Sequence, residues 1–455
     1  MKVTFLYFIW ILSIELLTAK EIFTQDKILD YMEISNPFVY TAIGNENIFK
    51  HRELYHLGSF DTEVSLKYDE KEYPVSDGKL LDIGVNKVLE NGTLLSVSYR
   101  KAQGIQEYNN IKTNNEGEIL AGINLPLVSL MSGMNSRKLD LNIASVNKIK
   151  LAYESKNNLR LLYHKILSQY IAVLYFNSIV KLQDKLLNKA KKRKDLIKKR
   201  VESGFLAQIA LLEAKQQIIN REQTLRSSEN SFAVAKESFV LYLNISKEKF
   251  LNQYTLLDIN EISYLQKDVN AYIEIALENR KDIKIYDLEI QKVHLRQKQT
   301  NQLQYPNIDL SFYGIRDFKG ENGYKAALSI KFPLERRKYE GQKLENRFSK
   351  KNIKMQQKKE IISVKTNLKN IFNSLRVLEV NIENSLIEIE LVKKLEESEN
   401  KKYLLGSSNL FMVNQREIYT LDIQKKRLDY NYRYLSLILD ANSEAGIGGL
   451  VVSQY

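Results

Sequence analysis

The side chains most often used for catalysis and metal binding are few and scattered in this sequence. The chain has no cysteine and four histidines, His51, His56, His164 and His294. Disulfides, thiolate metal sites and a cysteine nucleophile are therefore excluded, and the spacing of His51 and His56 does not align both rings on one helix face. No HExxH, GxxxxGK[ST] or nucleophile-elbow pattern occurs. The sequence predicts no enzyme, no metal site and no cofactor.

The remaining candidate functional positions lie around two glycine turns, "VESGFLAQ" at Gly204 and "YLLGSSN" at Gly406. Glycine accepts the left-handed backbone that ends many helices, and Ser408 or Asn409 can cap a following helix. Each turn therefore predicts the tip of a helical hairpin.

Long helices are predicted before and after each of these turns. Between residues 361 and 392, residues recur at seven-residue spacing in two series, an a/d pattern typical of a coiled coil: Ile361, Leu368, Leu375, Ile382, Ile389, and Val364, Ile371, Leu378, Ser385, Val392. One helix is predicted from about Arg337 to Leu404, and roughly 68 residues at about 1.5 Å each would extend about 100 Å. A second helix runs to about residue 440, and the first half repeats the hairpin over about 131–203 and up to about 243.

Upstream of each hairpin, apolar and polar residues alternate as in half-buried strands. The second half has strands at 307–318 and 324–332, and the first half at 61–68 and 118–125. Between the first-half strands, an Asn91-Gly92 turn indicates an added hairpin. One-sided strands suit a barrel wall in a membrane or an ordinary sheet on a core. The long helices favour the barrel, and so does a secretory signal in the first residues of the sequence.

The two halves are also marked by the same apolar phrase with a proline, "INLPL" and "IKFPL". From Pro126 to Gly204 is 78 positions, and from Pro333 to Gly406 is 73. Matched order and spacing predict an internal duplication. The expected division is a signal peptide at 1–19, a first repeat at 20–245, a connection at 246–267, a second repeat at 268–442 and a tail at 443–455.

The first residues combine an early lysine, an apolar run and Ala19, which is typical of a secretory signal. After them the sequence has no 18-residue apolar run. The net charge of +13 leaves nucleic acid as a candidate partner, but the basic tract at 189–200 is better explained as a solvated helix face, and no nucleic-acid partner is expected.

The sequence resembles the TolC-like outer-membrane efflux protein family, also called outer membrane factors. The resemblance covers about residues 25 to 442 and rests on the ordered pair of repeats, as in "AALSIKFPLERRKYEGQKLENRF" and "ESGFLAQIALLEAKQQ". It implies a mixed α and β membrane protein, in which a homotrimer forms a transmembrane β-barrel with four strands per protomer, continued by a long α-helical coiled-coil barrel. It also implies a place in the outer membrane, with outer-membrane lipid around the barrel and helices reaching into the periplasm. The implied protein partners are a periplasmic adaptor and an inner-membrane transporter.

The resemblance also assigns residues. Pro126 and Pro333 would mark where the chain leaves the barrel for the tunnel, and Pro306 the opposite crossing; the alternative is that they are helix-start prolines. At the periplasmic tip, Tyr403 matches a tyrosine of the closing network. Three positions where relatives carry an arginine or acids have other residues: Ser408, Met412 and Gln415.

The family's acidic constriction is therefore absent from the second half. Glu213, nine positions after Gly204, is the only acid at an equivalent offset, and it can equally be a solvated carboxylate paired with Lys215 or Lys199. We expect Met412 and Gln415 to form a constriction that binds cations weakly.

The primary hypothesis is a passive exit duct for efflux or type I secretion, gated at the helical tip around Gly204 and Gly406. The alternative is a periplasmic or surface coiled-coil scaffold with a small β module and no pore. A basic coiled coil that binds nucleic acid rests on charge alone.

Overall fold

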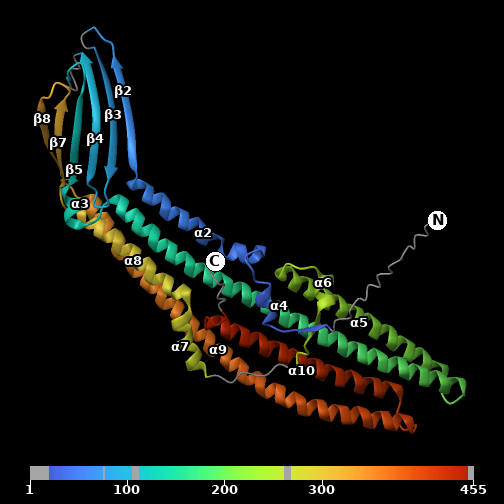
Figure 1. Ribbon diagram of the computed structural model, residues 1–455. Helices are drawn as coiled ribbons and strands as arrows, with labels where there is room; N and C mark the ends of the chain where they lie inside the picture. The colour runs from blue at the N-terminus through green and yellow to red at the C-terminus, as the bar shows by residue number, and fades with distance from the viewer. Residues whose placement is uncertain (1–19, 75–76, 105–111, 261–267, 449–455) are drawn as a thin grey trace, which may run out of the picture. The chain divides into compact units, whose positions relative to one another are not determined.

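The computed structural model describes residues 20–74, 77–104, 112–260 and 268–448. The predicted signal peptide and parts of the predicted connection and tail lie outside these residues. The fold is mixed α and β and mostly helical (Figure 1). The described strands are β1 Glu21–Phe23, β2 Thr62–Lys71, β3 Gly78–Val88, β4 Leu94–Gly104, β5 Glu118–Pro126, β6 Tyr254–Leu256, β7 Asn307–Asp317 and β8 Asn322–Lys331. The helices are α1 Lys27–Asp30, α2 Pro37–Leu57, α3 Leu127–Ser132, α4 Ser136–Glu202, α5 Gln208–Leu243, α6 Lys247–Gln253, α7 Val269–Asn279, α8 Lys281–Gln302, α9 Arg337–Leu404 and α10 Leu410–Glu444.

The chain divides into two compact units that interleave along the sequence. The first comprises residues 1–38, 164–266 and 371–440, and the second comprises 39–163, 267–370 and 441–455. None of the helices in the described ranges is long and apolar enough to cross a membrane.

The second unit holds an antiparallel sheet in the order β2-β3-β4-β5-β7-β8. This sheet has six strands, two more than the four per protomer that the family resemblance implies for a barrel. The added hairpin was predicted correctly, with Gly92 at φ 91° in its turn, but it forms β3 and β4 and lies between β2 and β5. Its strands have eleven residues each, and they pair with β2 from Gly78 to Lys87 and with β5 from Leu94 to Arg100.

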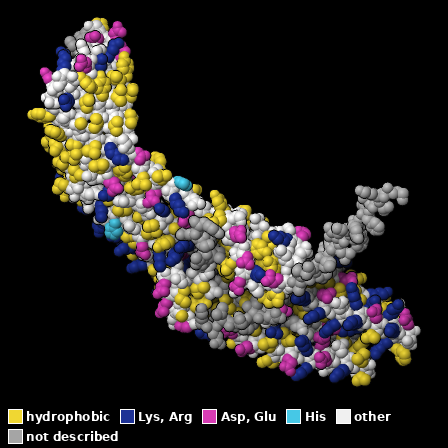
Figure 2. Space-filling view, viewed as in Figure 1, with side chains coloured by type: hydrophobic (Ala, Val, Ile, Leu, Met, Phe, Trp, Pro, Cys, Tyr) yellow, Lys and Arg dark blue, Asp and Glu magenta, His cyan; other side chains and the backbone are white. Residues whose placement is uncertain are grey.

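One face of this sheet is apolar from edge to edge. Cross-strand partners share a face, and the pairs Val64↔Val85, Val85↔Val97 and Val97↔Ala121 carry the apolar set from β2 to β5. The pairs Ile123↔Phe312 and Phe312↔Ala326 carry it on to β8. Figure 2 shows hydrophobic side chains gathered over the strands. Many of them are exposed, with Val64 at 76% and Leu328 at 63%.

The long helices begin and end close to their predicted residues. Helix α9 spans Arg337–Leu404, as expected from the heptads and Gly406. Helix α4 begins later than predicted, at Ser136, because Gly133 takes a left-handed φ of 66° and separates it from α3. Of the two predicted heptad series, most members are buried, including Val364, Leu368 and Ser385.

The first unit has an aromatic core around Phe23, which is fully buried. Its ring packs against Tyr170, Phe239, Phe250 and Tyr254, at centroid distances of 5.0 to 5.6 Å. Strand β1 also pairs in parallel with β6. Pairing and aromatic packing therefore fasten the start of the described chain to α4, α5 and α6.

Candidate tip, junction and sheet sites

Both predicted glycine turns have the expected backbone. Gly204 has a φ of 77° and Gly406 a φ of 80°, and nothing lies within 4 Å of where a Cβ would stand at either residue. The N–H of Gly406 donates to Tyr403 O at 3.2 Å, and the N–H of Ser407 to Lys402 O at 2.9 Å. These bonds satisfy the last carbonyls of α9. Asn409 then caps α10, since its Oδ1 accepts from Met412 N at 3.0 Å.

Tyr403 lies where the two helical hairpins meet in the first unit. Its ring packs on a buried cluster drawn from three helices, namely Ile197 of α4, Leu211 and Ala214 of α5, and Leu410 of α10. The Arg200 guanidinium lies 5.9 Å from the ring centroid. The Tyr403 hydroxyl is buried and has no hydrogen-bond partner among the described residues.

Of the remaining predicted tip residues, Glu213 lies on α5, Met412 and Gln415 lie on α10, and Ser408 lies in the turn before α10. Met412 and Gln415 are exposed, and Ser408 donates to Glu399 Oε1 at 2.5 Å. Glu213 is exposed too, and within the described residues no ion pair joins it to Lys215 or Lys199. The structure thus brings Tyr403 into the hairpin contact and leaves Glu213, Met412 and Gln415 free to face a further surface.

A buried ion cluster, which the sequence analysis missed, fastens the two hairpins together. Glu417 of α10 is 1% exposed, and both of its carboxylate oxygens are occupied. Arg193 of α4 donates from Nη1 to Oε2 at 3.0 Å and from Nη2 to Oε1. Arg221 of α5 donates from Nη2 to Oε2 at 2.8 Å and from Nη1 to Leu186 O at 3.0 Å. Arg193 also reaches Asn414 Oδ1 at 3.2 Å.

The charge balance of this cluster keeps Glu417 ionised. Burial alone would raise the pKa of the carboxyl, but hydrogen bonds and charge from Arg193 and Arg221 outweigh it and lower the pKa below 4.5. A buried carboxylate with this environment is strongly destabilising if either partner is removed. The ion pairs of Glu417 therefore connect α4, α5 and α10.

The signal that could have revealed Glu417 is its place in a heptad series. Leu410, Glu417, Gln424, Asn431 and Ile438 follow one another at seven-residue spacing, and Glu417 is the acid in that seam. An acid at a seam position is expensive to bury unless it has partners. Sequence alone did not show that Arg193 and Arg221 would lie opposite it.

The three prolines lie between strands and helices. Pro126 is the last residue of β5 and the N-cap of α3, Pro306 directly precedes β7, and Pro333 lies between β8 and α9. Proline suits such places because it has no N–H to donate and has a fixed φ. The positions agree with junctions between strand and helix.

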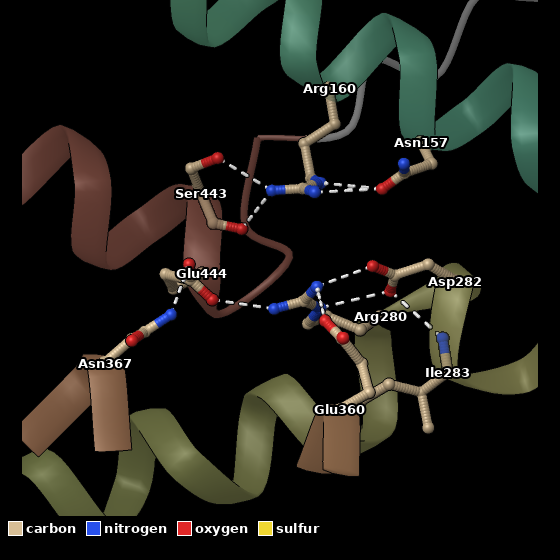
Figure 3. Close-up of polar contacts among 9 residues, drawn as sticks. All are labelled: Asn157, Arg160, Arg280, Asp282, Ile283, Glu360, Asn367, Ser443 and Glu444. Atoms are coloured by element: carbon tan, nitrogen blue, oxygen red, sulfur yellow. Dashed lines mark hydrogen bonds and ion pairs between the residues drawn. The ribbon is translucent and has the colours of Figure 1, made fainter. Parts of the chain in front are cut away.

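A second ion cluster, formed around the buried Arg280, lies in the second unit, where α10 ends (Figure 3). Arg280, between α7 and α8, donates to Asp282 at 2.5 and 3.1 Å, to Glu360 of α9 at 2.9 Å and to Glu444 of α10 at 2.7 Å. Burial tends to raise the pKa of Asp282, but the hydrogen bonds and charge of Arg280 lower it. One guanidinium thus joins three helices.

Arg160 of α4 completes this contact. It donates from Nη1 to Ser443 Oγ at 2.7 Å and to the Ser443 carbonyl, and from Nη2 to Asn157 Oδ1 at 2.9 Å (Figure 3). Burial, together with the charge of Arg280, lowers the pKa of Arg160. The end of α10 is held by two arginines, and sequence reasoning assigned neither.

Taken as a class, this is a mixed fold in which an amphipathic sheet accompanies long helical hairpins, and solved structures of outer membrane channels have the same fold. The open-state MtrE channel of Neisseria gonorrhoeae aligns with a TM-score of 0.72 at 11% identity, over 95% of this chain and 91% of that one. The outer membrane protein VceC of Vibrio cholerae aligns at 0.69 and 13% identity, over 94% and 97%. The CmeC outer membrane channel of Campylobacter jejuni aligns at 0.69 and 10% identity, over 95% and 87%.

No protein-family model matches the sequence, and no curated protein does. The resemblance to TolC-like outer membrane factors is thus confirmed at the level of the fold. These structural neighbours are channels rather than enzymes.

Proposed function

We propose that this chain is one protomer of a passive exit duct in the outer membrane that extends into the periplasm. Three copies would close their sheets into one transmembrane barrel and their helices into one tunnel. Pro126, Pro306 and Pro333 would be the crossings between the two. The duct would serve a tripartite efflux system or type I secretion.

The observation that carries this proposal is the apolar face of the sheet. It runs without interruption over all six strands, and its side chains are exposed at both edges and in the middle. An apolar surface of this extent needs a partner, and a barrel wall with lipid outside and water inside provides one. The fold shared with outer membrane channels supports the same assignment.

The hairpin tips would be the docking site for a periplasmic adaptor that links the duct to an inner-membrane transporter. Large apolar side chains flank both glycine turns and are exposed, namely Phe205, Ile209, Leu212, Leu405 and Phe411. Docking would repack the tip and open it, with Tyr403 at the hairpin contact. The exposed Met412 and Gln415 would line a constriction with little cation affinity.

The two repeats at 20–245 and 268–442 would each supply one hairpin, joined through 246–267, after removal of residues 1–19 as a signal peptide and before a tail at 443–455. The matched intervals from Pro126 to Gly204 and from Pro333 to Gly406 support this division.

The competing scaffold has no pore, and the exposed apolar sheet face disfavours it because that face would lie in water. The proposal is tested by purifying the protein from the membrane fraction. We expect a trimer that needs detergent and resists dissociation below its unfolding temperature. A monomer that stays in solution without detergent after signal removal would support the scaffold instead.

A further inference from the structure

The hairpin of β3 and β4 is part of the sheet rather than an appendage at its end. Every residue of β2 has a partner in β3, from Thr62↔Lys87 to Lys71↔Gly78. Strand β4 pairs with β3 over its full length and with β5 from Leu94↔Asn124 to Arg100↔Glu118. Removing the hairpin from the sheet would therefore expose the backbone of β2 and β5.

The turn of this hairpin is fixed at the end of the sheet where α3 and α4 begin. Asn135, just before α4, donates from Nδ2 to Glu90 O at 2.7 Å. A Cβ at Gly92 would stand 3.2 Å from Cγ of Pro126. Strands β3 and β4 thus run the same length of the sheet as β5.

The hairpin also has apolar side chains on the apolar face of the sheet and charged side chains on the opposite face. Ile83 and Val85 of β3 and Leu95 and Val97 of β4 lie on the apolar face and are exposed. The other face carries Asp82 and Arg100, whose Oδ2 and Nε are 2.9 Å apart. A hairpin that capped the mouth of a barrel would have no need of this alternation.

Among the residues that the structure describes, each of the two outer strands of the sheet, β2 and β8, pairs with a strand on one side only. Strands β2 and β8 have ten residues each and present the same apolar face, with Val64 and Leu66 on β2 and Leu328 and Ile330 on β8. Because four strands lie between them and every neighbouring pair is antiparallel, β2 and β8 run in opposite directions. Around a rotation axis, β8 of one copy therefore meets β2 of the next in antiparallel pairing. Inside a bilayer each edge must find such a partner, because no water is available to its N–H and C=O groups.

We infer that the wall of the duct is built from all six strands of each copy, so that three copies of the sheet close an eighteen-stranded barrel. The inference rests on the proposed homotrimer and departs from the four strands per protomer that the family resemblance implies. Barrel diameter grows roughly linearly with strand number, so the outlet is about 1.5 times as wide as one of twelve strands. Cargo size is then selected at the helical tip and not at the outlet.

The test uses the full chain in liposomes and exploits its lack of native cysteine. A fluorescent thiol label is placed at Val85→Cys or Val97→Cys on the apolar face of the hairpin, with Ser98→Cys on the opposite face as the matched control. Brominated lipid is then compared with ordinary lipid. We expect loss of fluorescence at 85 and 97 and little loss at 98.

A second measurement reads the seam with a short thiol cross-linker. Ser65→Cys in β2 is combined in turn with Lys325→Cys, Ala327→Cys and Ser329→Cys in β8, which share its face, and with Ala326→Cys on the other face as the control. We expect covalent dimers and trimers from at least one of the first three and none from the fourth.

A conducting trimer whose hairpin labels escape lipid quenching, or whose β2 does not link to β8 of another copy, overturns the eighteen-stranded wall and leaves the proposed duct standing. Failure to form any trimer or conductance overturns the proposed function and this inference with it.

Discussion

Oε2 of Glu417 accepts a hydrogen bond from Nη2 of Arg221 at 2.8 Å, although the two residues are 196 positions apart and both are nearly inaccessible to solvent. Glu417 belongs to the second helical hairpin and Arg221 to the first. This ion pair, together with the one between Glu417 and Arg193, holds the two hairpins together. A gate that opens by separating hairpins would have to break it or move it as a unit.

Glu417→Gln should loosen the hairpins. It removes the charge while Arg221 stays buried and Arg193 half-buried, and breaking a buried ion pair from one side costs about 3 kcal/mol. Hydrogen exchange of α5 and α10, measured by mass spectrometry, should rise. Asp422→Asn removes an exposed acid from the same helix and is the control, with an expected change below about 0.5 kcal/mol.

Replacing all three residues of the cluster at once distinguishes the loss of the ion pairs from the cost of leaving a buried charge without a partner. Arg193→Met, Arg221→Leu and Glu417→Leu together leave no buried charge, and such replacements are often neutral or stabilising. Exchange in α5 should return toward the unmodified level. If the triple variant were as loose as Glu417→Gln, the buried charges of the cluster would not be what determines how tightly the hairpins are held.

The contribution of Glu417 should depend on pH with a definite sign. Its pKa is lowered in the folded protein, so the unfolded chain binds the proton more readily. The stabilisation is fully present above the ordinary value of 4.5 and is lost as pH falls below 4.5 through the folded pKa. The difference in hydrogen exchange between the unmodified protein and Glu417→Gln should therefore be constant near neutrality and shrink below pH 4.5. A difference that persisted in acid would show that charge is not its source.

Alanine at the turn glycines should destabilise the tip through backbone conformation alone. Gly406 and Gly204 have positive φ and open space around the missing Cβ, so Gly406→Ala or Gly204→Ala should cost about 1 kcal/mol. Gly341→Ala, inside α9 and equally unobstructed, should instead stabilise by about 0.5 to 1 kcal/mol. The midpoint of thermal unfolding, followed at the hairpin amides, should fall for Gly406→Ala and Gly204→Ala and rise for Gly341→Ala. Shifts in the same direction for all three variants would refute the prediction.

The proposed constriction should bind multivalent cations weakly, because Met412 and Gln415 carry no charge. Single-channel current should be little reduced by added multivalent cations, and Met412→Asp with Gln415→Asp should raise the blocking affinity by at least about tenfold, since clustered carboxylates attract cations at short range. Strong block of the unmodified channel that survives Glu213→Gln would sink this account of the tip.

The sheet should be sensitive to one glycine and tolerant of its neighbour. A Cβ at Gly122 of β5 would stand 2.1 Å from Cδ1 of Tyr313, whose ring covers that glycine, whereas a Cβ at Gly314 of β7 meets nothing closer than 3.9 Å. Gly122→Ala must displace the ring and should lower the temperature at which the proposed trimer dissociates on gels. Gly314→Ala should leave it unchanged. Equal effects would mean that the Tyr313 ring does not lie over Gly122.

Local pattern predicted what depends on local chemistry. The extent of α9 followed from the heptads and Gly406, four strands of the sheet followed from alternation, and the hairpin of β3 and β4 followed from the Asn91-Gly92 turn. The place of that hairpin in the sheet did not follow, because strand order is decided by long-range pairing that alternation leaves open. Glu417 and Arg280 were missed for a related reason: their roles come from partners on other helices, and an isolated acid or arginine in a helical pattern usually faces solvent.

Planar-bilayer recording of the protein purified from the membrane fraction tests the central claim most directly. A duct predicts discrete, reproducible conductance steps from detergent-requiring trimers, with larger or longer openings after Glu417→Gln loosens the tip. Protein that remains monomeric without detergent and produces no conductance in either form would contradict the account.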